Sequence, residues 1–257
     1  MILSKRVALG DAYLDELHER IVILSIDPGV PHESNSAVNR MGGVGQRVVE
    51  QHWETLEVAV TYAIDIPKTE MAERKAVFDM VNAWALKKGW LTVNWLVGRR
   101  MYVDKVVLPD SGDLWNWTST YTITFRAYNI PFWQDDTPVS VVNANVTNGG
   151  LVISVPGTAP NVMDVSFQNI SGLNITNVNI SAGGNTLRMT GVNLAANQTL
   201  TISHGTDGLL RAYKGSTSVY SLITGSDDLY VEPGNVTVTV NATRAGRLTA
   251  SCYGRWL

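Results

Sequence analysis

Residues 54–89 read ETLEVAVTYAIDIPKTEMAERKAVFDMVNAWALKKG, and this stretch decides the fold of the first half of the chain. Apolar residues alternate along residues 56–64, which predicts a half-buried β-strand. After Pro67 the apolar residues recur at helical spacing, with glutamates in the first turn and two lysines in the last. Gly89 then ends the pattern. The stretch therefore predicts one amphipathic α-helix over residues 69–88.

The rest of the first half predicts strands around this helix and one long loop. A loop that could contact a partner is expected from about Pro28 to Gly45. The expected strands are short apolar or alternating runs, at Ile21–Ile26, Trp90–Leu96, Arg100–Leu108 and Trp115–Tyr128. A helix packed on a twisted β-sandwich or split barrel fits this order of elements.

The second half contains no convincing helical pattern and predicts an antiparallel β-sandwich of jelly-roll type. Turns are expected at Gly149-Gly150, Pro156-Gly157, Gly183-Gly184 and Pro233-Gly234. The expected strands are short and closely spaced, as such sandwiches require. They are Ser140–Asn145, Val152–Val155, Val162–Ile170, Asn174–Ile180, Thr186–Thr190, Thr199–Ser203, Leu209–Lys214, Leu229–Val231, Asn235–Ala242 and Arg247–Tyr253.

A change in composition between Pro131 and Pro138 predicts two domains, 1–137 and 138–257. Up to Thr137 the chain has 14 basic and 18 acidic side chains, a net charge of −4. The remainder has 6 and 5, a net charge of +1, and is rich in Asn, Thr, Gly and Val. Seven of the eight tryptophans lie in the first part, which is a further difference in composition between the two parts.

The bulk composition argues against several classes of function. A net charge of −3 gives no basic face for phosphate binding. The single cysteine, Cys252, excludes an internal disulfide framework and a cysteine-based zinc site. No apolar run reaches the roughly 18 residues of a membrane span. Residues 1–10 contain no apolar core of signal-peptide length, so we expect folding in a cytoplasm and no membrane insertion.

No motif in the sequence predicts catalysis, a cofactor or a metal. The Gly42-Gly43-Val44-Gly45 run lacks the Lys-Ser/Thr ending of a phosphate loop, and no Gly-x-Ser-x-Gly elbow occurs. The pairs Asp135/Asp136 and Asp227/Asp228 lie in turn contexts, where Asp caps its own backbone. The histidines show no metal-ligand spacing, which predicts surface or loop positions for all of them: His18, His32, His52 and His204.

A carbohydrate-binding role for the second half is the main rival to a structural one. Sugar binding usually needs a cluster of exposed aromatic side chains. The second half offers few of them, namely Phe167, Tyr213, Tyr220, Tyr230, Tyr253 and Trp256. Its many Asn-x-Ser/Thr triplets are explained by an Asn- and Thr-rich composition, without glycosylation.

Several local patterns, in their order along the chain, resemble the siphophage distal tail protein family in its short two-domain form. The first is the Gly-rich run that ends at Gly45, followed by the alternating strand and the helix ending Asn82-Ala83-Trp84-Ala85. An Arg99-Arg100 hairpin and the run Tyr121–Trp133 come next. The last is Leu229–Val238 with the terminal Tyr253-Gly-Arg-Trp256. These patterns occur in the same order as in that family over nearly the whole chain.

This resemblance implies a structural virion protein with a mainly β fold. The first domain would be a tail-tube-like β-sandwich or split barrel with one helix, forming a hexameric ring. The ring would join the tail tube protein to the tail-tip or baseplate proteins, and DNA would pass through without specific binding. The second domain would be a galectin-like β-sandwich that anchors receptor-binding proteins for host attachment. Another tail-tip or baseplate structural protein remains an alternative.

The candidate interface residues are arginines in the predicted loop and at the predicted hairpin tip, together with a pair of tryptophans, because these residue types often anchor interfaces. They are Arg40, Arg47, Arg99, Arg100, Trp115 and Trp117. The alternative is that the tryptophans belong to the core and the arginines are merely solvated. The net negative charge of the first domain suits a lumen that does not grip DNA, although the sequence does not show which residues face it.

Overall fold

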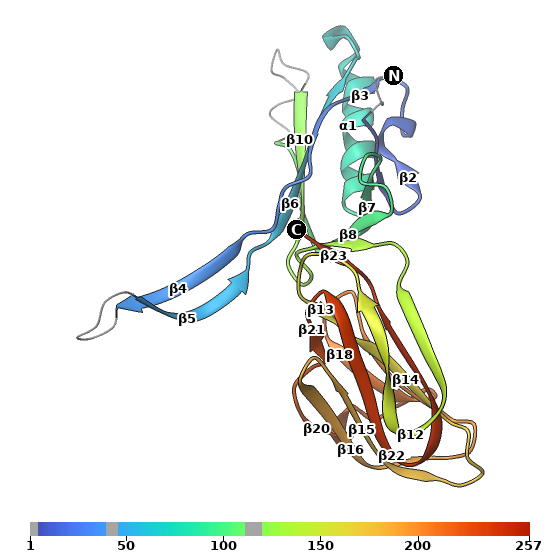
Figure 1. Cartoon of the computed structure of the whole chain (residues 1–257). Coiled ribbons are helices and arrows are strands. Elements are labelled where there is room, and N and C mark those ends of the chain that lie inside the picture. The colour runs from blue at the N-terminus through green and yellow to red at the C-terminus, as the bar shows by residue number, and fades with distance from the viewer. Residues whose placement is uncertain (1–4, 40–45, 111–119) are drawn as a thin grey trace. The chain divides into compact units, whose positions relative to one another are not determined.

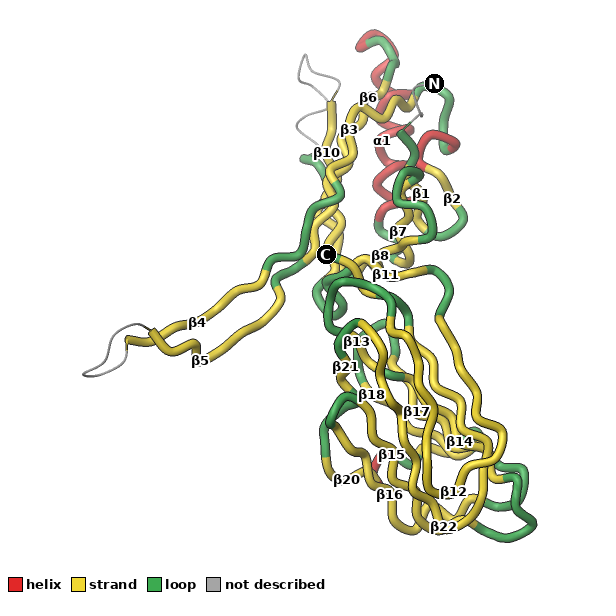
Figure 2. Tube along the Cα trace, viewed as in Figure 1, coloured by secondary structure: helices red, strands yellow, loops and turns green. Residues whose placement is uncertain are grey.

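The computed structural model describes residues 5–39, 46–110 and 120–257, without the side chains of residues 37–39 and 46–51. The chain divides into two compact units, of which unit 1 comprises Met1–Trp133 with Leu257 and unit 2 comprises Gln134–Trp256. The predicted boundary after Thr137 lies just beyond this division. The predicted mainly β fold class is confirmed, with a single α-helix of more than one turn in the described parts of the chain (Figure 2).

Unit 1 has two antiparallel sheets on either side of its helix, and a separate hairpin (Figure 1). One sheet has the order β3-β6-β10-β9 and the other contains β2-β1-β7-β8. The elements are β1 (Val7–Leu9), β2 (Ala12–Tyr13), the 3-10 turn η1 (Leu14–Glu16), β3 (Ile21–Asp27), β4 (Glu33–Asn39), β5 (Gln46–Trp53), β6 (Leu56–Ile64), η2 (Lys68–Glu70), α1 (Met71–Ala85), β7 (Gly89–Val93), β8 (Arg99–Val103), β9 (Lys105–Val107) and β10 (Thr120–Ala127).

The predicted helix is confirmed as η2 followed by α1, and it packs on one face of the β3-β6-β10-β9 sheet. The buried faces of β6 and β10 alternate as the sequence predicted. Aromatic side chains join the layers: the Phe78 and Tyr121 rings lie 5.2 Å apart, and the Trp84 and Phe125 rings 5.8 Å apart. The Trp84 indole also donates a hydrogen bond to the Ala12 carbonyl on β2. The apolar stripe of the helix therefore holds unit 1 together.

Arg74 is an unexpected member of this core. Its side chain is almost fully buried, and its guanidinium donates to the Ile66 carbonyl at 3.0 Å and to the Tyr121 hydroxyl at 2.8 Å. Burial of a cation requires such hydrogen bonds, because desolvation would otherwise exclude it from the interior. Arg74 thus fixes the start of α1 to the end of β6 and to β10.

Two predictions for unit 1 were wrong in ways that matter for the function. The expected loop from Pro28 to Gly45 contains β4, which pairs with β5 in a two-stranded hairpin. Among the described residues this hairpin pairs with no further strand. The expected strand 100–108 is two strands in different sheets, β8 and β9. The turn at Asp104 separates them, because its carboxylate accepts hydrogen bonds from the backbone of Tyr128 and Asn129.

The largest part of unit 2 is a nine-stranded antiparallel sheet that folds over a single apolar core. Its elements are β12 (Val139–Val155), β13 (Asn161–Val162), β14 (Asp164–Asn169), β15 (Ile175–Ala182), β16 (Asn185–Leu194), β17 (Thr199–His204), β18 (Leu210–Lys214), β19 (Thr217–Ser218), the 3-10 turn η4 (Tyr220–Leu222), β20 (Ile223–Gly225), β21 (Tyr230–Val231), β22 (Gly234–Cys252) and β23 (Arg255–Trp256). A short strand, β11 (Trp133–Asp135), spans the division between the units. The strand order of the large sheet is β19-β18-β17-β14-β22-β15-β16-β20, with β12 also on β22.

The long strands β12 and β22 correct the predicted strand list. Four expected short strands merge into these two, because β-bulges at residues 143–148 bend the pair without ending it. The expected turn at Gly149-Gly150 is wrong, since both glycines lie inside β12. A Cβ at Gly150 would approach the Val238 carbonyl oxygen to 2.2 Å, so close strand contact explains this glycine. β22 pairs with β14 along its second half and with β15 along its first.

No helix in the described parts of the chain is long and apolar enough to cross a bilayer.

Candidate functional site

Most of the predicted interface residues fall where the structure says little. Arg40, Trp115 and Trp117 lie outside the described residues. The backbone of Arg47 belongs to β5, opposite Val38 of β4, and its side chain is not described. The role of these four residues in an interface therefore remains a prediction.

Arg99 and Arg100 are described, and they begin β8 just after a tight turn from β7. The Arg100 guanidinium lies 4.0 Å above the centre of the Trp90 ring, a cation–π contact within unit 1. The turn itself presents apolar side chains to solvent: Val97 is 87% exposed and Trp95 is partly exposed. The arginine pair is thus half-buried and held on its own sheet, and the turn beside it carries the exposed apolar surface.

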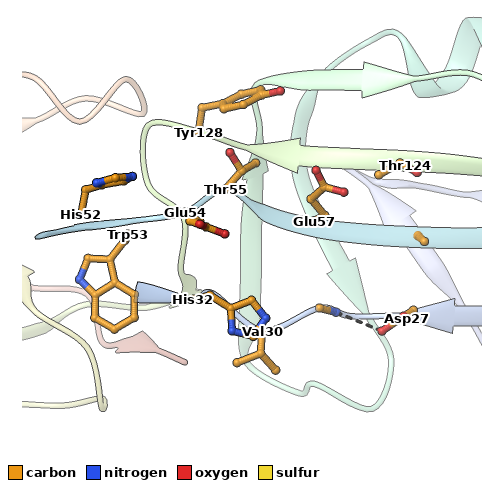
Figure 3. A pocket seen from close by; sticks show the side chains of 12 residues that line it. Asp27, Val30, His32, His52, Trp53, Glu54, Thr55, Glu57, Thr124 and Tyr128 are labelled. Carbon is orange, nitrogen blue, oxygen red and sulfur yellow. Dashed lines mark hydrogen bonds between the residues drawn. The ribbon is translucent and has the colours of Figure 1, made fainter. Parts of the chain in front are cut away.

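Unit 1 also carries a groove that the sequence did not predict. The groove has a volume of about 750 Å³ and lies where the sheet face opposite α1 meets the base of the β4–β5 hairpin (Figure 3). Strand alternation places Ala59 and Thr124 on this face, while their neighbours on β6 and β10 are buried under the helix. The Thr61 and Thr122 hydroxyls contact each other across the same face at 3.1 Å.

The lining of this groove combines carboxylates with aromatic rings. In Figure 3 the side chains of Glu54 and Glu57 lie between Tyr128 on one side and Trp53 on the other. Glu57 forms an ion pair with Arg126 at 2.8 Å. Asp27 accepts a hydrogen bond from the Gly29 backbone at 3.3 Å, which shapes the turn before the hairpin. The groove is therefore open, acidic and flanked by rings.

In unit 2 the structure overturns the prediction for His204. This histidine ends β17 with its side chain only 5% exposed, so it is not a surface residue. Its Nδ1 lies 2.7 Å from an Asp164 carboxylate oxygen, and its Nε2 lies 2.7 Å from an Asp228 carboxylate oxygen. Asp228 is itself buried, so the prediction that it only caps its own turn was also incomplete. A ring that donates to two carboxylates must carry both protons.

Electrostatics favours the imidazolium form of His204. Burial alone would lower the pKa of His204, but hydrogen bonds to Asp164 and Asp228 outweigh it and raise that pKa to about 9. Nearby Arg255 is also buried, and desolvation lowers its pKa to about 10. Burial raises the pKa of the Cys252 thiol to about 11, with Asp164 and Asp135 adding to the shift. Unit 2 therefore contains a buried network of opposite charges.

This network has the composition of a structural clamp. Both ring nitrogens of His204 are occupied by carboxylates, which leaves neither of them available as a base for a substrate. Among the described residues, no group of three or more His, Cys, Asp or Glu side chains is arranged to hold a metal. The three members come from β17, the start of β14 and the turn before β21, so the network ties distant segments of unit 2 together.

The two units together define a class of chain: a helix-bearing β unit followed by a folded-over antiparallel sheet. A solved structure with this fold is the SPP1 Dit (gp 19.1) protein, a paradigm of the hub adsorption apparatus in phages that infect Gram-positive bacteria. The match covers 98% of this chain and 99% of that chain, with a TM-score of 0.68 and 11% sequence identity. The predicted resemblance to the distal tail proteins is thus confirmed at the level of the fold.

Chains from the baseplate of phage p2 in its activated conformation, with Sr or Ca, match more weakly. Their TM-scores are 0.46 and 0.44 with 10% and 9% identity, over 96% of this chain and 97% of theirs. No protein-family model matches the sequence, and no curated protein matches it.

Proposed function

We propose that the protein is a structural component of a phage tail, a distal hub that joins the tail tube to the tip or baseplate. The observation that carries this proposal is the fold shared with the SPP1 Dit protein over nearly all of both chains. A match of this extent includes both units, so it supports a common architecture for the entire chain. The location that follows is the tail tip of the virion, after synthesis in the host cytoplasm.

In this proposal the first domain, 1–137, forms a closed ring of identical copies, six by resemblance to the family. The second domain, 138–257, is galectin-like, faces outward and anchors receptor-binding components. Ring formation is supported by what unit 1 leaves uncovered: a bare sheet face, a self-paired hairpin and the exposed Val97 turn. Sheet surfaces and edges without intramolecular partners are available to a neighbouring copy.

DNA passes through the ring without being bound specifically. The composition of residues 1–137 supports this role, because 14 basic and 18 acidic side chains give this domain a net charge of −4. A negatively charged domain does not attract the phosphates of DNA, whose binding depends on lysines and arginines. The role assigned to the protein is therefore structural, without catalysis or cofactor.

The oligomeric state of the purified chain tests this proposal. We expect light scattering and negative-stain images to give closed rings of copies at micromolar concentration. A protein that stays monomeric at high concentration would contradict the hub. If such a monomer also bound a specific glycan on an array, the carbohydrate-binding alternative would replace it.

A further inference from the structure

The sheet β3-β6-β10-β9 presents different surfaces on its two faces. The groove described above lies on one face, at Ala59 and Thr124. The helix α1 covers the other face, where Val58, Val60 and Phe125 are buried beneath it. A ring of identical copies needs such an arrangement, because each copy must meet its neighbour with two different surfaces.

The groove has uncompensated negative charge. Glu57 is paired with Arg126, but Asp27 and Glu54 have no cation within ion-pair distance among the described side chains. In Figure 3 Glu54 lies between the Trp53 and Tyr128 rings, and Asp27 lies farther along the groove. Carboxylates next to aromatic rings suit a lysine, whose ammonium pairs with the acid while its alkyl stem packs on the ring.

A basic and apolar knob stands on the opposite side of the same sheet, at the end of α1. We define this knob as Leu86, Lys87 and Lys88. Leu86 is 57% exposed, and both lysines are exposed without a carboxylate partner among the described side chains. Met80, earlier on α1, is also exposed.

The backbone at Lys88 is a second sign that the knob is unusual. Lys88 has a φ of 54°, the left-handed conformation that normally favours glycine at the end of a helix. Glycine would relieve that conformation, and Gly89 follows directly with a φ of 130°. A lysine at this position places a cation beyond the last helical turn at the expense of local stability.

We propose that the knob of one copy docks into the groove of the next copy. Lys87 and Lys88 pair with Asp27 and Glu54, while Leu86 packs against the rings that flank the groove. The contact is heterologous, and its repetition closes a ring when the rotation between neighbouring copies is a whole fraction of a turn. This inference rests on the proposed hub function and names the residues through which unit 1 assembles.

A charge exchange tests the contact in the full-length chain. The variant Lys87→Glu/Lys88→Glu and the variant Asp27→Lys/Glu54→Lys each place like charges opposite each other. We expect the dissociation constant of the assembly, measured by sedimentation, to rise at least tenfold in each. A chain that carries both sets of substitutions restores opposite charges and regains most of the wild-type assembly. The control for the reversal of a surface charge is Arg244→Glu, at an exposed position in unit 2.

The outcomes separate this contact from the hub function. If wild-type rings form and the exchanged chains assemble as well as the control, the knob and groove do not meet, although the hub survives. If the combined variant is no better than the single ones, the pairing is wrong. A wild-type chain that remains monomeric overturns the hub and the contact together. Lys88→Gly distinguishes loss of the contact from misfolding, because it removes one lysine of the knob and also relieves the left-handed backbone. We expect this variant to have a higher melting temperature and weaker assembly than the wild type.

Discussion

Unit 1 and unit 2 are both antiparallel β structures, but they differ in what they leave uncovered. Unit 2 folds one sheet over its own core and closes it with a charged clamp at His204. Unit 1 covers only one face of its β3-β6-β10-β9 sheet with α1, and extends a hairpin that pairs with itself. The difference indicates a division of labour, in which unit 2 is self-contained and unit 1 is completed by neighbouring copies.

The clamp in unit 2 gives the largest expected effect. His204→Ala leaves Asp164 and Asp228 close together with no cation between them, and an uncompensated buried charge of this kind costs about 3–5 kcal/mol. We expect the circular dichroism transition of unit 2 to move to lower temperature. Tryptophan fluorescence should move little, because seven of the eight tryptophans lie in unit 1. His32→Ala, at an exposed position, is the control. Equal shifts for the two variants would refute the clamp.

The same clamp predicts a loss of stability in alkaline solution. The folded pKa of His204, about 9, lies above its ordinary value of 6.5. The contribution of His204 to the free energy of unfolding is therefore fully present below pH 6.5 and is lost as the pH rises through 9. The loss amounts to at most about 3 kcal/mol. Denaturant titrations of the wild type between pH 6 and pH 9.5 measure it. A His204→Gln variant should show a flatter profile over this window. The loss of stability that begins near pH 9, as Cys252 ionises in the unfolded chain, is common to both proteins and cancels in the comparison. Parallel profiles would be inconsistent with the prediction.

Removal of Arg74, the buried cation in unit 1, should lower the free energy of unfolding less than removal of His204. Arg74→Met removes two hydrogen bonds, to Ile66 and Tyr121, but it also removes the desolvation of a buried charge and keeps most of the packing. These effects partly cancel, so we expect a loss of about 1–2 kcal/mol in tryptophan-monitored unfolding. A loss as large as that of His204→Ala would mean that unit 1 depends on buried charge as unit 2 does.

The smallest expected effect is a gain in stability at the end of α1. Lys88→Gly removes the left-handed conformation of a residue with a side chain, and we expect unit 1 to gain about 0.5–1 kcal/mol. Lys87→Gly, one residue earlier, is the matched control and should not stabilise, because Lys87 has no positive φ. A loss of stability in Lys88→Gly would show that the lysine side chain supports unit 1 internally.

Periodicity predicted the parts of the fold in which one face of an element is buried. The β6 strand, α1 and the buried face of β10 follow directly from their apolar spacing. The β4–β5 hairpin was missed because its polar sequence has no such apolar pattern. The two strands are regular because they pair with each other. The glycines at 149–150 were misread as a turn because close approach of Val238 also requires glycine.

The functional residues were harder to predict, because they are brought together from distant positions. His204 has no partner at metal-ligand spacing, and its carboxylates come from positions 40 and 24 residues away in the sequence. The groove combines residues before β4, after β5 and on β10, which no local pattern connects. Exposed charges such as Glu54 and Lys88 were visible in the sequence. Their lack of partners became visible only in the structure.

Hydrogen–deuterium exchange at low and high protein concentration tests the division of labour most directly. At concentrations where copies associate, we predict slower exchange at the base of the hairpin, residues 27–32 and 52–57, and at the end of α1, residues 80–89. The strands β14, β15 and β22 of unit 2 should exchange at the same rate at both concentrations. Protection that appears in unit 2 and spares unit 1, or no protection in a protein shown to assemble, would contradict the account.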